Sequence, residues 1–382
     1  MKICAVICEY NPFHYGHAYQ IEKIKEKYDR VVCIMSGNFT QRAEPAIIDK
    51  YVRATQALKN GADMIIQLPT LYACSSAQFF AKGAINVLRN LPIDAISFGM
   101  ENDNVDILTK IAQCEKNEEY KSILKSSLEQ GNSYISSCVK AITQCLSSKD
   151  ETYVTDFLSK PNNMLAIEYV KAINEYGLKW DIFPVKRNSD YNSNSLSGKF
   201  VSASAIREAY ENSIDVSKFI PNYELFATIP KADLKTFKAI QLSTLRLQDE
   251  KSIIKLSNAG EGLENKLTKN ALTCSTLDET LEKTKSKRYS FARIKRLALD
   301  CVLDLKKEDI VFPDKATAIM LAVKNDFIPY LKQFSPYLIT ENSQLSSFIP
   351  QSFVKIEEHA EKFYSTICST PYNGIIKKLV KA

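Results

Sequence analysis

The chain has 382 residues, of which 45% are hydrophobic and 25% are charged, and its formal net charge at pH 7 is +6. This length predicts two or three domains at about 150 residues each, and the mild positive charge permits a polyanionic partner without requiring one. No apolar run approaches the ~18 residues of a membrane span, and the N-terminus lacks the features of a signal peptide. We therefore expect a cytoplasmic protein that makes no contact with a membrane.

Ten cysteines are scattered along the chain, and no two of them form a Cys-x-x-Cys pair. Several lie inside apolar segments, which indicates reduced thiols in a protein core and argues against a disulfide framework or a zinc site. The sequence therefore gives no reason to name a metal-ligating residue.

The first elements predict a ligand site. Residues 2–8 form an apolar run that is typical of a buried parallel strand, and a helical pattern begins near His17. The turn between them, with His14, Gly16 and His17, lies at the carboxyl end of the strand, where open α/β sheets bind ligands. The free N–H groups and the dipole of the helix favour an anion there. Two imidazoles, separated by a glycine that has no Cβ, would complete a site for phosphates.

A lone His-x-Gly-His also occurs by chance, and a histidine in a turn is usually a solvated residue. Here the chain has three histidines and two of them are in this turn. Because the strand before it and the helix after it are the context that the motif requires, we favour a nucleotide site. The arrangement resembles the signature of the adenylyl- and cytidylyltransferase superfamily, in which the histidines contact the α and β phosphates.

Strands and helices alternate through the first half of the chain. Strands are expected at residues 31–35, 64–68, 95–98 and 180–185, and helices at 49–60, 75–90 and 163–176. This order predicts an α/β fold with a Rossmann-like parallel sheet. It is interrupted by a helical insertion at about 103–150, and the polar loop 186–199 is expected to be a mobile lid. The alternation is lost near residue 214, so we predict an ATP-binding domain over 1–213 and a mainly helical domain over 214–382.

Two polar segments follow predicted strands. Residues 36–42 form a loop that ends in Arg42, which could bind a phosphate or a carboxylate in a bidentate fork, although an ordinary surface arginine is an equally good reading. Ser202, Ser204 and Arg207 lie at the start of a helix that one of the two serines would cap. Hydroxyls, free N–H groups and a cation suit phosphate oxygens, and the segment is similar to the second signature of the nucleotidyltransferase superfamily. A capped helix is the simpler alternative, but the position after the fifth strand supports the phosphate site.

Two further positions follow the fourth strand or open a helix. Gly99 lies where the adenine or ribose of a nucleotide would be placed. One of Asn162 and Asn163 is expected to cap the helix that begins there, and a nucleotide contact by the other is the alternative.

A basic segment in the second half indicates RNA. Residues 283–296 hold seven basic residues and no acidic one, and Tyr289 and Phe291 are interleaved with them. Uncompensated charge with aromatic side chains suits phosphate contacts and base stacking, whereas the alternative is a solvated helix face. We favour RNA, with the following candidate contacts: Lys287, Arg288, Arg293, Lys295 and Arg296.

Several motifs together resemble the tRNA(Met) cytidine acetate ligase family. They are Glu9-Tyr10-Asn11-Pro12-Phe13-His14-x-Gly16-His17, Met35-Ser36-Gly37-Asn38-Phe39-x-Gln41-Arg42, Gly61-Ala62-Asp63, Leu68-Pro69, Pro161-Asn162-Asn163 and Lys287-Arg288-Tyr289. The resemblance departs from the family pattern at Ala43, where a glycine is usual, and at Met100, where a small polar residue is usual.

The resemblance implies a HUP-type nucleotidyltransferase domain followed by a helical tRNA-binding domain. Its activity would be ATP-dependent acetylation of the wobble cytidine of elongator tRNA(Met) to N4-acetylcytidine, through acetyl-adenylate and with release of pyrophosphate. ATP with Mg²⁺ would be the cofactor, acetate and elongator tRNA(Met) would be the substrates, and no obligatory protein partner is expected. The implied catalytic residues are His14, His17 and Arg207. The implied ATP contacts are Ile7, Cys8, Glu9, Tyr10, Asn11, Pro12, Phe13, His14, Tyr15, Gly16, His17, Ala18, Tyr19, Gln20, Gly99, Asn162 and Arg187, to which the residues add Ser202 and Ser204.

Two other functions remain open from the sequence. A small-molecule adenylyl- or cytidylyltransferase would need only the first half of the chain, and the basic segment speaks against it. A non-catalytic RNA-binding protein with a vestigial nucleotide fold would not need the histidine pair or the segment at Ser202 to Arg207.

Overall fold

The computed structural model describes residues 1–132, 134–146, 151–187, 196, 198, 200–286, 288–348 and 350–382. Most of the predicted lid at 186–199 and the predicted RNA contact Lys287 therefore lie outside the described residues. Within the described residues, no helix has both the length and the apolar character needed to cross a membrane.

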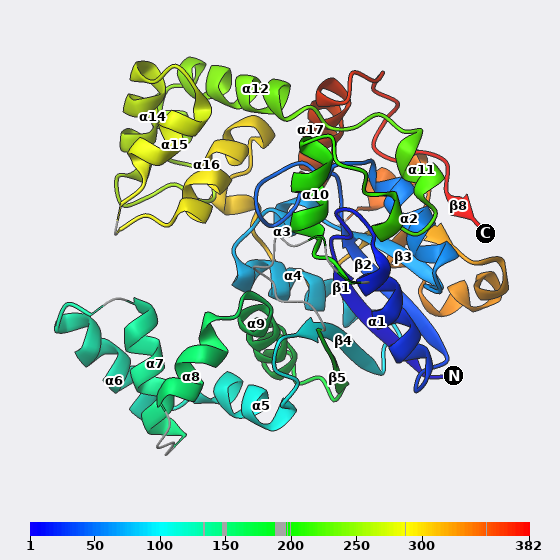
Figure 1. Cartoon of the computed structure of the whole chain (residues 1–382), viewed down its shortest axis with the longest axis horizontal. Coiled ribbons are helices and arrows are strands. Elements are labelled where there is room, and N and C mark those ends of the chain that lie inside the picture. The colour runs from blue at the N-terminus through cyan, green and yellow to red at the C-terminus, as the bar shows by residue number, and fades with distance from the viewer. Residues whose placement is uncertain are drawn as a thin grey trace.

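The centre of the molecule is one eight-stranded sheet (Figure 1). Five parallel strands lie in the order β5-β4-β1-β2-β3, and β6 pairs antiparallel with β3. Two short strands, β7 and β8, pair with β6. The bounds are Ile3–Cys8 for β1, Arg30–Ser36 for β2, Met64–Leu68 for β3, Ala95–Met100 for β4, Asp181–Lys186 for β5, Ala318–Val323 for β6, Leu338–Ile339 for β7 and Val380–Lys381 for β8.

The strand order creates a switch point beside β1. From β1 the chain proceeds to β2 and β3 on one side and returns to β4 and β5 on the other. β1 is in register with both neighbours, since Cys4 lies opposite Val31 on β2 and opposite Ala95 on β4. Loops that leave β1 and β4 at their carboxyl ends therefore diverge and leave a crevice between them, where doubly wound sheets bind ligands. The predicted Rossmann-like fold is confirmed, with one antiparallel strand added at its edge.

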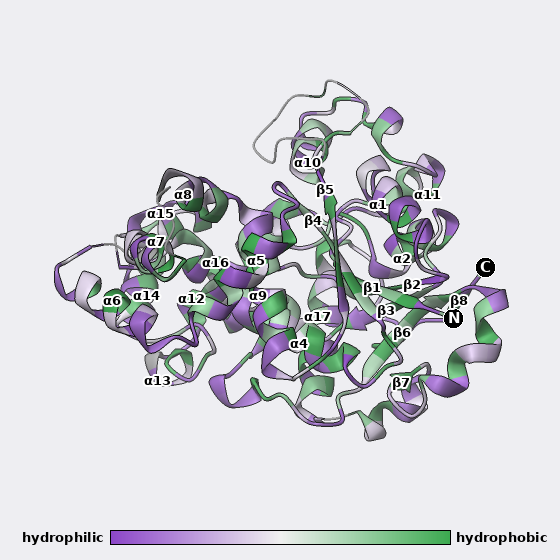
Figure 2. Cartoon of the chain, turned by 90° about the horizontal axis from the view of Figure 1, so that it is seen from below, coloured by the Kyte–Doolittle hydropathy of each residue, from purple (hydrophilic) through white to green (hydrophobic). Residues whose placement is uncertain are grey.

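Helices cover both faces of this sheet (Figure 2). On one face, α1 (Tyr15–Lys25) packs against β2, β4 and β5, and α2 (Lys50–Lys59) packs against β3 and β6. On the other face, α4 (Ala77–Leu88) packs against β3 and α9 (Pro161–Glu175) against β4. The strands between them are buried on both sides, which explains their continuous apolar runs.

Two groups of helices extend from the same end of the sheet, as Figures 1 and 2 show. The first, between β4 and α9, is formed by α5 (Val105–Cys114), α6 (Glu118–Glu129), α7 (Tyr134–Cys145) and α8 (Glu151–Ser159). It contains the predicted insertion and continues past residue 150. The second is formed by α12 (Leu234–Leu247), α13 (Glu250–Ile253), α14 (Leu263–Thr273), α15 (Leu277–Thr284) and α16 (Phe291–Leu303), which share a separate hydrophobic cluster between Leu242 and Cys301.

The remaining elements connect these groups to the sheet. α10 (Ala203–Glu211) and α11 (Tyr223–Ala227) follow β5, and α17 (Ser352–Ile367) packs against α3 (Thr70–Ala73), α12 and α16. The predicted helix at 75–90 starts at Ala77, because Ser76 is its N-cap.

The sequence analysis missed the strands of the last quarter of the chain. β6 joins the sheet at β3, and the main core cluster runs from Ile3 to Ile376. The sheet thus contains strands from both sides of the predicted boundary between residues 213 and 214. That two-domain division stays a prediction, and we propose that the separately packed part is the α12–α16 group.

Candidate active site

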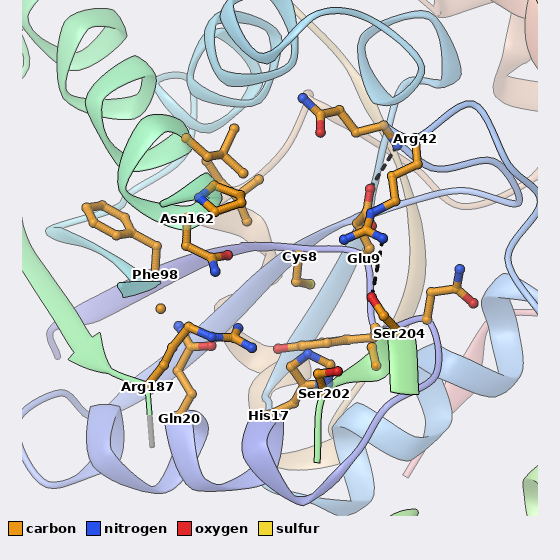
Figure 3. Close-up of a pocket in the computed structure, with 18 of the residues that line it drawn as sticks. Cys8, Glu9, His17, Gln20, Arg42, Phe98, Asn162, Arg187, Ser202 and Ser204 are labelled. Atoms are coloured by element: carbon orange, nitrogen blue, oxygen red, sulfur yellow. Dashed lines mark hydrogen bonds between the residues drawn. The ribbon is translucent and has the colours of Figure 1, made fainter. Parts of the chain in front are cut away.

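A cavity of about 430 Å³ opens at the carboxyl ends of β1 and β4 (Figure 3). Its volume is in the range of small-molecule sites. The predicted site residues that line it are Ile7, Cys8, Glu9, Tyr10, Asn11, His14, His17, Gln20, Gly99, Asn162, Arg187, Ser202, Ser204 and Arg207. Gly16 and Tyr19 line a small adjoining cavity, whereas Pro12, Phe13, Tyr15 and Ala18 line neither.

The two histidines lie at the N-terminal end of α1. His14 is the N-cap: its Nδ1 accepts the N–H of Gly16 at 3.0 Å, and Nδ1 of His17 accepts the N–H of His14 at 3.3 Å. The rings stack with their centroids 3.7 Å apart. Since each Nδ1 acts as an acceptor, the proton of each neutral ring is at Nε2, which is then a hydrogen-bond donor.

Burial keeps both rings neutral. It lowers the pKa of His14 to about 3, with a further contribution from the nearby charges of Arg187 and Arg207. Burial also lowers the pKa of His17 well below its usual range, and the His14 ring adds to this effect. The pair therefore offers two neutral N–H donors to a triphosphate at neutral pH. No free energy is spent on removing a proton from either ring.

Gly16 is required by close packing between the histidines. A Cβ at this position would lie 2.8 Å from Cε1 of the His14 ring, closer than two carbon atoms can approach. The expectation that this glycine leaves room for the imidazoles is confirmed.

The start of α10 completes the cationic end of the cavity. Ser202 is the N-cap and accepts the N–H of Ala205 at 3.2 Å, which leaves Ser204 in the first turn. Arg42 donates to the hydroxyl of Ser204 at 3.3 Å (Figure 3). Arg207 donates to the carbonyl of Asn11 at 2.6 Å. The two sequence motifs thus meet, although about 190 residues separate them. Burial and the charge of Arg42 lower the pKa of Arg207.

Arg187 is held ready for a ligand. It follows β5, and its backbone N–H bonds to the carbonyl of Met100 at 2.8 Å. Its Nε is buried and has no hydrogen-bond partner among the described residues. A Cβ on Gly99 would approach the Arg187 side chain at 3.3 Å, so the glycine permits this side chain to lie along β4. A buried donor without a partner is expected where a ligand supplies the acceptor.

The prediction that Asn162 or Asn163 caps α9 is wrong. Lys160 is the N-cap position, and no side chain caps this helix end. Asn163 instead accepts the N–H groups of Glu101 and Asn102 at 3.2 and 3.3 Å, and Asn162 donates to the Glu101 carboxylate. The pair therefore fixes the loop after β4, and Asn162 remains on the wall of the cavity.

One buried cation fixes the ends of β1 and β2. The guanidinium of Arg53, fully buried on α2, donates to the carbonyls of Glu9 and Ser36 at 2.6 and 3.1 Å and also to the carbonyl of Gly37. The sequence analysis did not single it out, because a basic residue on a helix is usually exposed.

Aromatic and aliphatic side chains form the opposite side of the cavity, and the sequence analysis missed them. Phe98 at the end of β4 lies there in Figure 3. Phe80 of α4 and Leu165 and Tyr169 of α9 also line the cavity. In the sequence they have the same spacing as core residues. Only Phe98, next to Gly99 at a strand end, carried a positional signal.

The predicted basic segment has more partners than its sequence indicates. Arg293 bonds to the carboxylate of Glu261 at 2.9 Å, and Lys295 pairs with Glu44. Arg296 donates to the side chain of Asn258 at 3.1 Å, while Arg288 is exposed. The expectation of uncompensated charge is therefore wrong for Arg293 and Lys295. The pair with Glu44 places α16 next to the loop that carries Arg42.

The described residues provide no protein cage for a metal ion, since they hold no group of three or more His, Cys, Asp or Glu side chains that could bind one. All ten cysteines are free.

Comparisons with known proteins agree on one family. The model of the family described as HIGH Nucleotidyl Transferase matches residues 1–377. A protein from Thermosipho africanus, named tRNA(Met) cytidine acetate ligase, is 32% identical over 95% of this chain and 90% of its own length. Its namesake from Clostridium acetobutylicum is 38% identical over 78% of each chain.

Two solved structures have the same fold over their whole length. The apo structure of Thermotoga maritima TmcAL superposes with a TM-score of 0.90 at 27% identity, and its complex with alpha-thio ATP superposes with a TM-score of 0.88. Both cover 100% of this chain and of their own.

Proposed function

This chain belongs to the tRNA(Met) cytidine acetate ligase family, and from that premise we propose that it activates acetate with ATP and acetylates the wobble cytidine of elongator tRNA(Met). Acetyl-adenylate would be the intermediate, pyrophosphate the first product, and N4-acetylcytidine the modified nucleoside. The observation that carries the proposal is the cavity in which the two histidines and the start of α10 converge, in a fold that binds alpha-thio ATP in a relative.

The first step suits these residues. Acetate is ionised at neutral pH, so its attack on the α-phosphate needs no base and depends on placing the reactants in line and on stabilising negative charge. We assign the Nε2 donors of His14 and His17 to the phosphates near α1. The hydroxyls of Ser202 and Ser204, the free N–H groups of α10 and the guanidinium of Arg207 would bind the remaining phosphates.

Magnesium would arrive with the nucleotide. Because the described residues offer no cage of protein ligands, the ion would be held mainly by the phosphates of ATP and by water, which is how proteins usually bind this cation. Bound in this way, it supplies further neutralisation of the phosphate charge.

The RNA would approach from α16. Lys295 joins this helix to Glu44, and a groove of about 870 Å³ that includes Glu44 reaches the cavity at Arg207. We propose that Arg288, with Lys287, binds tRNA phosphates, and that Arg293, Lys295 and Arg296 both hold the segment in place and face the RNA. A cytoplasmic location and independence from a protein partner stay predictions.

The test is incubation with ATP, radiolabelled acetate and total bacterial tRNA, followed by nucleoside analysis. Label in N4-acetylcytidine that depends on both ATP and tRNA is the expected result. Transfer of a nucleotide to a small molecule without tRNA would favour a small-molecule nucleotidyltransferase. Binding of tRNA without any ATP turnover would favour a non-catalytic RNA-binding protein.

A further inference from the structure

One residue of the cavity does not fit a site built only for ATP. Among the lining residues that the structure describes, Glu9 alone carries a carboxylate, while Arg42, Arg187 and Arg207 supply cations. A carboxylate beside a triphosphate is repelled by it, so this side chain would weaken ATP binding unless it serves another step.

Hydrogen bonds fix both the side chain and the backbone of Glu9. Its Oε1 accepts the backbone N–H of Gln41 at 2.8 Å, and its carbonyl accepts from Arg53 at 2.6 Å. In Figure 3 the Glu9 side chain lies beside Arg42, at the carboxyl end of β1 and next to Cys8. No hydrogen bond to its Oε2 is present among the described residues, so one carboxylate oxygen is left for a ligand.

Glu9 shares the cavity with both kinds of lining. It lines the cavity together with Arg42 and Arg207 and with Tyr169 of the aromatic wall, which can stack a nucleobase. Its charge acts on both groups: it partly offsets the lowering of the Arg207 pKa by burial and by Arg42, and it adds to burial in raising the pKa of Tyr169.

We propose that Glu9 is the general base of the acetyl-transfer step and also positions the target cytosine by accepting a hydrogen bond from its exocyclic amine. This inference rests on the proposed function. The lone pair of N4 attacks the carbonyl carbon of acetyl-adenylate and forms the N–C bond. The C–O bond to AMP then breaks, AMP leaves with the electron pair, and one N4 proton passes to the Glu9 carboxylate.

The two steps of the reaction differ in their need for such a group. Acetate carries no proton at neutral pH, so adenylation gives a base nothing to remove. The exocyclic amine is a weak nucleophile that must lose a proton, and a positioned base contributes about 10²- to 10⁴-fold to such a step. A carboxylate is also the side chain that reads the amine of cytosine.

The experiment compares the two steps in Glu9→Gln, which keeps the acceptor for Gln41 and removes the charge. Acetate-dependent ATP–pyrophosphate exchange reports adenylation. Single-turnover mixing with synthetic acetyl-adenylate and unmodified tRNA reports transfer. Glu9→Asp retains a carboxylate one methylene shorter, and Glu26→Gln, on the exposed end of α1 and 58% exposed, controls for loss of one negative charge.

We expect Glu9→Gln to slow transfer at least about 100-fold more than it slows exchange, with the tRNA concentration dependence little changed. Glu9→Asp should recover part of the transfer rate, and Glu26→Gln should match the unmodified enzyme in both assays. Equal losses in exchange and transfer would overturn the inference and make Glu9 part of ATP or magnesium binding. Unchanged transfer would also overturn it. Absence of acetate-dependent exchange in the unmodified enzyme would reject the proposed function itself.

Discussion

The imidazole of His14 stacks on the imidazole of His17 at a centroid distance of 3.7 Å, and both rings use Nδ1 to accept a backbone N–H. The two Nδ1 hydrogen bonds set the tautomer and the orientation of the pair, and burial sets its lack of charge. Donors that are fixed before the substrate arrives need no reorganisation as negative charge develops, which is the main electrostatic advantage of an enzyme site.

The Nε2 donor of His14 can be separated from its role as a cap. His14→Asn keeps an acceptor for the N–H of Gly16, since asparagine is a good N-cap, but its amide stops short of the Nε2 position. We expect acetate-dependent ATP–pyrophosphate exchange to fall by about 10²- to 10³-fold with little loss of stability. His14→Gln, whose longer amide can place a donor near the Nε2 position, should retain more exchange. Full exchange in His14→Asn would exclude a phosphate contact by this ring.

The lowered histidine pKa values predict loss of stability in mild acid. Below about pH 6.5 the unfolded chain binds a proton at His14 that the folded chain, with a pKa of about 3, does not bind. Stability from this residue is present above that pH and is lost by about 1.4 kcal/mol per pH unit as the pH falls, and His17 acts in the same direction.

The measurement is the free energy of unfolding in urea at a series of pH values between about 5 and 7.5. Asp300 acts in the opposite direction, because burial raises its pKa to about 6. The comparison is therefore made with His14→Asn, whose slope should be smaller by about 1.4 kcal/mol per pH unit at the acid end of the series and nearly equal to that of the unmodified protein at its alkaline end. Parallel curves would show that His14 is not protected from protonation.

Ala43, where the family resemblance leads us to expect a glycine, has a φ of +57°. A residue with a Cβ is strained in this left-handed conformation by about 1–2 kcal/mol, whereas glycine loses more backbone entropy on folding. Ala43→Gly should therefore raise the free energy of unfolding by about 0.5–1 kcal/mol. Ala46→Gly in the same loop, where φ is not positive, should lower it. The measurement is the free energy of unfolding of both variants in urea. Destabilisation by Ala43→Gly would mean that the alanine methyl group makes compensating contacts.

The basic residues in and just before α16 should separate into two classes. Arg288 is exposed, so Arg288→Gln should weaken tRNA binding, reduce the slope of log affinity against log salt by about 1, and leave stability unchanged. Arg293 holds Asn258 and Glu261, so Arg293→Gln should also destabilise the α12–α16 group. Filter binding over a salt series measures the tRNA affinity of each variant, and thermal unfolding measures its stability. Unchanged tRNA affinity in Arg288→Gln would remove this residue from the RNA surface.

The sequence predicted those parts of the site that depend on local geometry. The turn at His14 to His17 and the cap at Ser202 are set by neighbouring residues, and each follows or opens a recognisable element. The aromatic wall could not be predicted in this way, because Phe80 and Tyr169 have the spacing of core residues and only the packing of α4 against α9 shows that they border a cavity.

The errors have a similar cause. Asn163 looked like a cap because it lies near a helix start, yet its side chain bonds to a loop about 60 residues away. The apolar run at 318–323 was a signal for β6, but its partner strand lies about 250 residues earlier and leaves no trace in the local pattern. The basic segment looked uncompensated because Glu44 and Glu261 are distant in the sequence.

The pairing of β6 with β3 has a consequence for how the protein is made. A nascent chain that has emerged only to residue 213 has synthesised strands β1 to β5 and both predicted phosphate-binding motifs, but not β6, the strand that covers the edge of β3. An uncovered strand edge is a template for pairing with other chains. The N-terminal half is therefore exposed to aggregation until the ribosome has added more than about 100 further residues, and a fragment cut at that boundary should need a chaperone that the whole chain can do without.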